Sequence, residues 1–245
     1  MTRRVALINN GSQYAGPALA REYARRGHDL VLAMPADGLV EELEGLGATV
    51  EVVPGRIDIS EPGHAQQLVD AALARFGRID SAVMFSGRII IGRFTNSTVE
   101  QLDDIVHTCL HAPYEFLKAV VPPMVEAKSG QVLVITSAAG ARPTPGAPLY
   151  SSVRAGATMM AKNVADEVAS TGVQVNACGT NFMDFPEFRK AAGADDPERR
   201  KFIESQVPMG RLGTMEEFAA FCMAFLDGSS QFTTGQYVAY AGGWA

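Results

Sequence analysis

The chain has 245 residues, of which 47% are hydrophobic and 20% charged, and its formal net charge is −6 at pH 7. This length and composition allow one full hydrophobic core, so we expect a single domain over residues 1–245. The acidic balance and the lack of a basic run argue against nucleic-acid binding. No apolar stretch approaches the ~20 residues that a membrane span needs, so no membrane partner is expected.

The cysteines, the histidines and the N-terminus bear on location and metals. Cys109, Cys178 and Cys222 are an odd, scattered set, which favours reduced thiols in the cytoplasm over a disulfide framework. His107 and His111 have the spacing of two ligands on one helix face, but no further ligands accompany them, so we expect no metal. The N-terminus runs directly into a strand-like segment, so no signal peptide is expected.

Short β-branched runs alternate with longer segments of helical periodicity. Strands are expected at Val5–Asn9, Asp29–Ala33, Thr49–Pro54, Ser81–Phe85, Gln131–Thr136, Val173–Cys178 and Gln236–Ala239. Helices are expected near residues 16–27, 36–46, 62–76, 98–127, 149–170 and 215–227. This alternation predicts an α/β, Rossmann-like, doubly wound fold with a mostly parallel sheet of seven strands. The Pro/Gly/Asp-rich stretch 184–197 is expected to be a mobile loop or lid.

Polar or small residues follow or close four of the expected strands: Asn9, Ser86, Ser137 and Gly179. In a doubly wound sheet, ligands bind outside the carboxyl ends of the strands. We therefore expect these positions to converge on one cleft.

The first strand–helix turn departs from a dinucleotide fingerprint. Such a fingerprint places glycines where backbone amides approach a pyrophosphate at a helix N-terminus. Here Gly11 and Gly16 are kept, but Asn10 and Tyr14 fill the positions that would admit a cofactor. Since a tyrosine ring competes with phosphate and ribose for the same volume, no dinucleotide is expected to bind. The simpler interpretations are that Gly16 allows close helix–strand packing and that Tyr14 is a surface aromatic residue.

Ser137, Tyr150 and Arg154 form the run Ser-x12-Tyr-x3-Arg. Residues four apart share one helix face, so Arg154 lies beside Tyr150. Arginine keeps its proton and stabilises a phenolate, while the Ser137 hydroxyl can hold a substrate oxygen near the phenol. This arrangement indicates acid–base catalysis. The alternative is that Tyr150 and Arg154 only decorate an exposed helix.

Over essentially its whole length, the chain resembles the short-chain dehydrogenase/reductase superfamily. The resemblance rests on Ser137 and Tyr150, on Asp58 within 56–60, and on the run 175–179. The departures are Arg154 in place of a lysine, Asn10 and Tyr14 in the glycine-rich turn, and Met84-Phe-Ser-Gly87 in place of an Asn-Asn-Ala-Gly segment.

These departures resemble the halohydrin dehalogenases, cofactor-free relatives of that superfamily, whose first motif is similar to Asn9-x4-Tyr14-x-Gly16. The resemblance implies a carbon–halide lyase that converts vicinal halohydrins to epoxides plus halide, and that opens epoxides with azide, cyanide, nitrite or halide. It implies Ser137, Tyr150 and Arg154 as catalytic residues, and a halide site at Tyr14, Thr180, Asn181, Phe182 and Met183, with backbone N–H groups around Phe182 and Met183 facing the anion. It also implies that no cofactor is used.

The resemblance further implies a homotetramer assembled through helices 98–127 and 149–170. The substrate pocket is expected to be lined by Phe85, Ile89–Ile91, Phe94, Phe182, Phe185 and Phe188. Two alternatives stay open. One is an NAD(P)-dependent oxidoreductase with an unusual turn, and the other is a catalytically silent binding or regulatory protein on the same scaffold.

Overall fold

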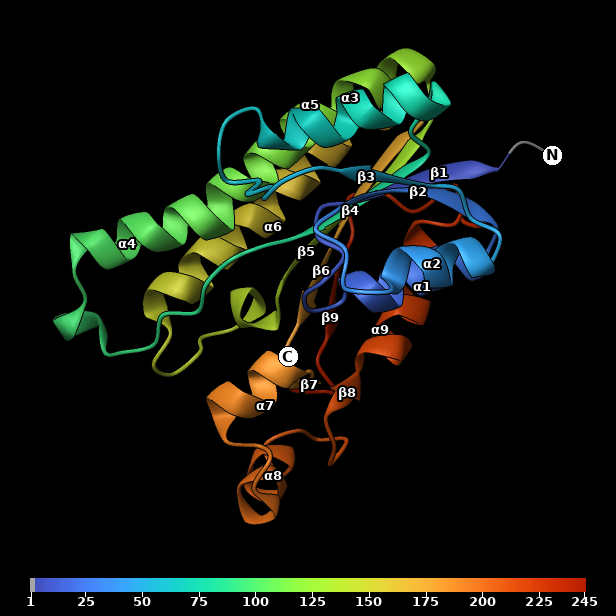
Figure 1. Ribbon diagram of the computed structural model, residues 1–245. Helices are drawn as coiled ribbons and strands as arrows, with labels where there is room; N and C mark the ends of the chain where they lie inside the picture. Colours follow the sequence, from blue (N-terminus) through green and yellow to red (C-terminus); the bar gives the residue numbers. More distant parts are fainter. Residues whose placement is uncertain (1–2) are drawn as a thin grey trace.

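Seven parallel strands form the central sheet of this computed structural model, which describes residues 3–245 (Figure 1). The strand order is β3-β2-β1-β4-β5-β6-β9. The strands are β1 (Arg4–Ile8), β2 (His28–Ala33), β3 (Val50–Val53), β4 (Ser81–Phe85), β5 (Gly130–Ser137), β6 (Val173–Thr180) and β9 (Tyr237–Tyr240). Each of the seven strands expected from the sequence is confirmed to within two residues at either end. All eight residues of β5 are buried, as its continuous apolar run predicts.

Helices cover both faces of the sheet, which gives the expected doubly wound α/β architecture (Figure 1). One core cluster packs α1 (Gly16–Arg25), α2 (Leu39–Gly45) and α9 (Met215–Cys222) on one face. A second cluster packs α3 (His64–Phe76), α5 (Ala112–Ala127) and α6 (Pro148–Val168) on the other. Short 3₁₀ turns lie at Phe94–Asn96, Ala138–Ala141, Ala169–Thr171 and Met223–Phe225. Among residues 3–245, no helix is both long and apolar enough to cross a bilayer.

The single helix expected over 98–127 is divided. It consists of α4 (Val99–Val106), a π-helical segment (His107–His111) and α5. Thr98 begins α4 with a capping box, in which its side chain and that of Gln101 bond to each other's backbone. The π-helical segment inserts one wide turn, a feature that is frequent at functional sites.

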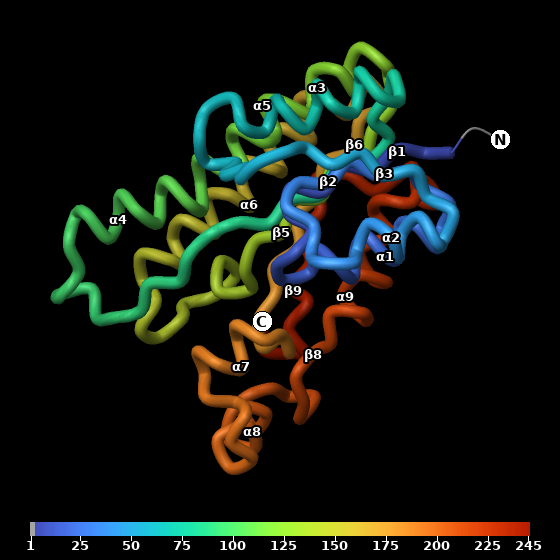
Figure 2. Tube along the Cα trace, viewed as in Figure 1, coloured from blue at the N-terminus to red at the C-terminus, as the bar shows by residue number. Residues whose placement is uncertain are grey.

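An excursion of the chain projects beyond the carboxyl edge of the sheet (Figure 2). It is bounded by the parallel pair β7 (Met183–Asp184) and β8 (Gly213–Thr214), and it contains α7 (Pro186–Ala192) and α8 (Pro197–Glu204). The expectation of a loop over 184–197 is therefore wrong for most of its length. Both helices are short and begin with proline, whose fixed φ suits the first helical turn but is also typical of loops.

Candidate active site

A pocket of about 1140 Å³ opens at the carboxyl ends of the strands, where the sequence predicts a cleft. Asn9, Ser86 and Ser137 line it, as expected. Gly179 does not. A Cβ there would lie 2.2 Å from the Tyr237 hydroxyl oxygen and 2.6 Å from the Ser137 carbonyl carbon, so glycine is required for close strand packing.

Ser137 ends β5 and presents its hydroxyl to the pocket. Its Oγ accepts a hydrogen bond from the Ala139 backbone N–H at 3.2 Å and donates to the Thr180 carbonyl at 3.4 Å. The bond to Thr180 is long, so the hydroxyl proton can be redirected to a substrate oxygen at little cost.

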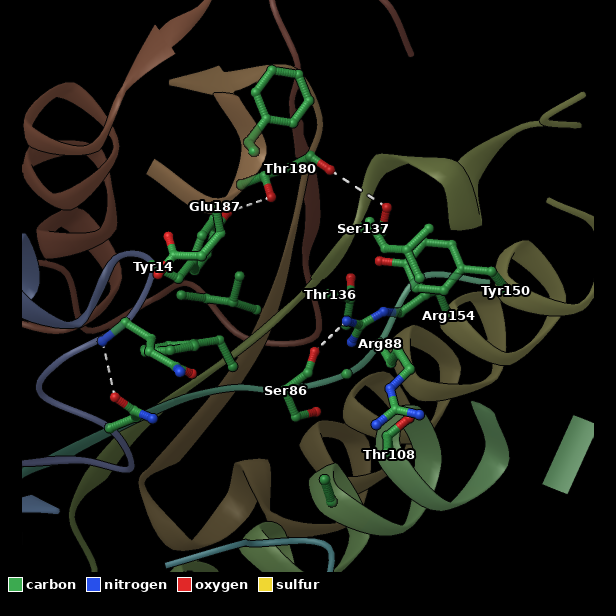
Figure 3. A pocket seen from close by; sticks show the side chains of 18 of the residues that line it. Tyr14, Ser86, Arg88, Thr108, Thr136, Ser137, Tyr150, Arg154, Thr180 and Glu187 are labelled. Carbon is green, nitrogen blue, oxygen red and sulfur yellow. Dashed lines mark hydrogen bonds between the residues drawn. The ribbon is translucent and has the colours of Figure 1, made fainter. Parts of the chain in front are cut away.

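Tyr150 and Arg154 lie on one face of α6, whose first helical residue is Pro148. Their exposed fractions are 6% and 5%, so the alternative that they decorate an exposed helix is wrong. The Arg154 guanidinium carbon lies 5.2 Å from the centre of the Tyr150 ring, and an Nη atom donates to the Ser86 carbonyl. Figure 3 shows Ser137, Tyr150 and Arg154 grouped on one side of the pocket.

The charge of Arg154 is secured by its surroundings. Burial works to lower the pKa of the guanidinium, but the Tyr150 phenol and the Cys109 thiol outweigh it, and the net shift is upward. Arg154 is therefore a permanent cation beside the phenol.

Tyr14 reaches across the pocket from the opposite side (Figure 3). Its φ is +49°, and its ring packs edge-on against Phe85 and Phe185, with ring centres 5.5 and 5.0 Å away. Its hydroxyl shares a 2.5 Å hydrogen bond with Oγ1 of Thr180. Since Tyr14 follows β1 and Thr180 ends β6, the ring crosses the ends of β4 and β5, which lie between them. Burial raises the pKa of Tyr14, so the phenol stays protonated.

The segment 180–183 also lines the pocket, as expected, but the Thr180 hydroxyl and the Phe182 N–H are engaged within the chain. The Phe182 N–H, expected to face an anion, donates instead to the Asn181 side-chain oxygen at 3.0 Å. Phe182 has a φ of +54°, and its ring lies 5.7 Å from that of Trp244. Met183 packs into the core.

Most of the expected apolar lining is present. Phe85, Ile89, Ile91, Phe182, Phe185 and Phe188 line the pocket, whereas Ile90 and Phe94 do not. Sequence reasoning missed Thr108, which also lines it, and Cys109, whose charge interaction with Arg154 is noted above. Both lie in the π-helical segment, which has the same apolar periodicity as an ordinary helix and so gives no signal in the sequence.

Residues 15–245 match the model of a family described as enoyl-(acyl carrier protein) reductase. The chain belongs to this family. It is 27% identical to 3-oxoacyl-(acyl-carrier-protein) reductase FabG of Thermotoga maritima, covering 98% of this chain and 97% of that protein. It is 28% identical to the enzyme of the same name from Escherichia coli K12, covering 98% and 96%. The crystal structure of levodione reductase superposes with a TM-score of 0.87 at 26% identity, covering 99% of this chain and 98% of that one.

These findings correct the functional expectation. The family and the relatives are reductases, so the expected carbon–halide lyase of the halohydrin dehalogenase type is wrong. The expected cofactor independence, and the expected halohydrin, epoxide and small-anion partners, are wrong with it. Arg154 and Tyr14 resemble the dehalogenases, whereas similarity over residues 15–245 indicates a reductase. The homotetramer stays a prediction.

A nicotinamide dinucleotide is the cofactor that the fold family implies. The residues that line the pocket show how much room there is for it. Beyond Tyr14, the pocket continues past Ser12, Met34 and Asp58, which leaves a groove along one half of the crevice. The ring of Tyr14 narrows the crevice near Ser137 and Tyr150, but one pocket runs past it from Asp58 to Tyr150. A dinucleotide that reaches Tyr150 has to pass this narrowing.

Proposed function

We propose that the protein is an oxidoreductase that acts at the oxygen of a carbonyl or secondary hydroxyl group, with Tyr150 exchanging a proton with that oxygen. The observation that carries this proposal is the burial of Tyr150, beside the fixed charge of Arg154, in the pocket that also holds the Ser137 hydroxyl. The reductase names of the relatives support the reaction class.

Each of the three side chains has a distinct part in this proposal. Ser137 donates a hydrogen bond to the substrate oxygen and fixes its position. Tyr150 gives a proton to that oxygen in the reducing direction and takes it back in the oxidising direction. Arg154 stabilises the phenolate that remains, because its charge is held close to the ring in a site of low dielectric.

The pocket walls indicate the substrate class. The aromatic and aliphatic side chains Phe85, Ile89, Phe182, Phe185 and Phe188 surround the reactive group. We therefore expect a small substrate with an apolar body and one reactive oxygen. All three cysteines are buried and free, and we place the protein in the reducing cytoplasm on that basis.

The test is turnover of a panel of small ketones and secondary alcohols, with NADH, NADPH or their oxidised forms supplied as the redox partner that such a reaction needs. We expect measurable turnover in the wild type and a loss of about a hundredfold or more in Tyr150→Phe, which removes only the phenolic oxygen. Tyr114→Phe is the matched control, because Tyr114 is half exposed on α5, and it should retain full activity.

Two results would overturn the proposal. One is the absence of turnover with every dinucleotide and every carbonyl or alcohol in the panel. The other is turnover that survives in Tyr150→Phe at the level of the Tyr114→Phe control.

A further inference from the structure

Cys109 and Arg154 press against the same glycine. A Cβ on Gly87 would stand 2.5 Å from the Arg154 Nη2 atom and 2.5 Å from the Cys109 Sγ atom. Gly87 has a φ of +111°, a conformation that side chains rarely allow. Because Gly87 has no side chain, the Cys109 thiol and the Arg154 guanidinium can both pack against its backbone and lie near each other.

The π-helical segment explains how the thiol reaches this position. Cys109 is its central residue and is fully buried, and it belongs to a small apolar cluster that includes Ile105, Tyr150 and Val153. The wide turn carries Cys109 inward from the long helix, toward α6. The sulfur has only weak polar contacts of its own, at 3.8 Å from both the Arg88 carbonyl and the Thr108 hydroxyl. Its place is therefore set by the fold and not by a strong hydrogen bond.

The buried guanidinium of Arg154 makes few hydrogen bonds, so its position depends on the groups packed around it. A guanidinium carries five N–H donors, and a buried one is normally held by several acceptors. Here one hydrogen bond reaches the Ser86 carbonyl, and the buried Nε atom has no hydrogen-bond partner. A long side chain with so few hydrogen bonds is held in place mainly by packing.

We propose that Cys109 is a positioning residue, whose sulfur, together with Gly87, forms the wall that holds the Arg154 guanidinium against the Tyr150 ring. A thiol suits this task because sulfur is large and polarisable and accepts weak hydrogen bonds from a cation. The proposal rests on the proposed role of Tyr150 and deepens it, since the position of the cation sets how well the phenolate is stabilised.

Three titratable groups raise the pKa of Arg154: Tyr150 on α6, Cys109 in the π-helical segment and Tyr14 from the turn after β1. Arg88 also lines the pocket, where its charge is paired with Asp104 on α4. Tyr14 is held protonated by burial, so a change at Cys109 acts on the remaining pair, Arg154 and Tyr150. If the sulfur is removed, the guanidinium gains room to move away from the ring, and the phenolate should form only at higher pH.

The experiment measures the ionisation of Tyr150 by ultraviolet difference absorbance, taking each protein against its own Tyr150→Phe partner. We expect the ionisation midpoint of Cys109→Ala to rise by about half a pH unit or more, and that of Cys109→Ser to rise by less, because serine keeps a polar atom at the wall. Cys222→Ala is the matched control. It deletes an equally buried thiol from α9 on the other face of the sheet, and its midpoint should not change.

Activity gives a second readout. In the direction in which Tyr150 accepts the proton, the acid limb of the rate profile should move to higher pH in Cys109→Ala by the same amount, while Cys222→Ala keeps the wild-type profile. If Cys109→Ala does not fold, the smaller shift expected in Cys109→Ser becomes the test. A midpoint equal to that of the wild type in the folded variant overturns the proposal.

The two proposals fail in different ways. A shifted Tyr150 midpoint in a protein that turns over no carbonyl or alcohol supports the role of Cys109 and refutes the oxidoreductase function. If turnover depends on Tyr150 but is unchanged in Cys109→Ala, and the Tyr150 midpoint does not shift, the oxidoreductase function is supported and the role of Cys109 is refuted.

Discussion

The transition from β1 to α1 and the transition from β5 to α6 each place a tyrosine at the carboxyl edge of the sheet, but the two phenols have different surroundings. Tyr14 is enclosed by aromatic rings, and its hydroxyl is engaged by Thr180. Tyr150 lies beside the charge of Arg154. At the same edge of one sheet, aromatic packing makes one phenol a structural wall, and a fixed cation makes the other a candidate acid–base group.

The largest loss of activity should follow from removing the charge of Arg154, which lies beside Tyr150. Arg154→Met keeps much of the side-chain length but leaves the phenolate unsupported, so turnover should fall by about a hundredfold or more. The measurement is kcat in the presence of either dinucleotide. Arg199→Met serves as control, since Arg199 lies over Phe202 on the projecting excursion and does not line the pocket. Equal activity in Arg154→Met and Arg199→Met would mean that the charge beside Tyr150 does not distinguish this phenol from Tyr14.

The second prediction concerns Tyr14, on the opposite side of the pocket. Tyr14→Gly should change stability and dinucleotide affinity by removing the packed ring. Loss of the partly buried ring should lower the free energy of unfolding by about 2–4 kcal/mol. Because the ring narrows the crevice, its removal should also tighten the binding of NADPH by about tenfold or more. Urea unfolding and fluorescence titration measure the two effects. Unchanged dinucleotide affinity in the folded variant would mean that the ring does not obstruct the crevice.

A smaller effect is expected when only the Tyr14 hydroxyl is removed. Tyr14→Phe keeps the ring and loses the bond to Thr180, so stability at pH 7 should fall by about 1 kcal/mol. Since burial raises the pKa of Tyr14 above that of the unfolded chain, its contribution is complete below about pH 10 and is lost at higher pH. The variant should therefore lose stability less steeply than the wild type between about pH 10 and 11, by up to about 1.4 kcal/mol per pH unit. Urea unfolding at a series of alkaline pH values tests this, and parallel slopes would contradict it.

The smallest effect concerns the C-terminal tail. The Arg142 guanidinium donates to the Trp244 carbonyl at 2.6 Å and lies 4.8 Å from the indole, which in turn packs against Phe182 at the pocket wall. Arg142→Gln should cost less than about 1 kcal/mol of stability. It should raise KM more than it changes kcat, since Phe182 shapes the pocket and does not touch the proton path. A change in kcat alone would contradict this expectation.

The sequence predicts the sheet well because its signals are local. The apolar run of β5 and the Ser137–Tyr150–Arg154 spacing can be read directly, and the structure brings these three residues together in one pocket. The spacing implies a position on α6, and the buried strand implies the position of Ser137 at the edge of the sheet.

Other parts could not be read in this way. The π-helical segment His107–His111 has the apolar periodicity of the helices around it, so the inward position of Cys109 depends on a backbone irregularity without a sequence signature. The helices α7 and α8 are short and start with proline, which is equally typical of loops. The predicted reaction class was wrong for another reason: Tyr14 and Arg154 point to a dehalogenase when taken alone, and similarity over residues 15–245 points to a reductase.

The pairing of β7 with β8 has a consequence for how this chain can diversify. Met183 pairs with Gly213, and Asp184 with Thr214, so the excursion between them leaves and returns at one point. Insertions, deletions or grafted segments between 185 and 212 would therefore change the roof of the pocket without shifting the register of the sheet. The β7–β8 pair thus separates the sheet and its catalytic side chains from a segment that can be exchanged, and it marks the boundaries at which substrate range can be swapped between related proteins.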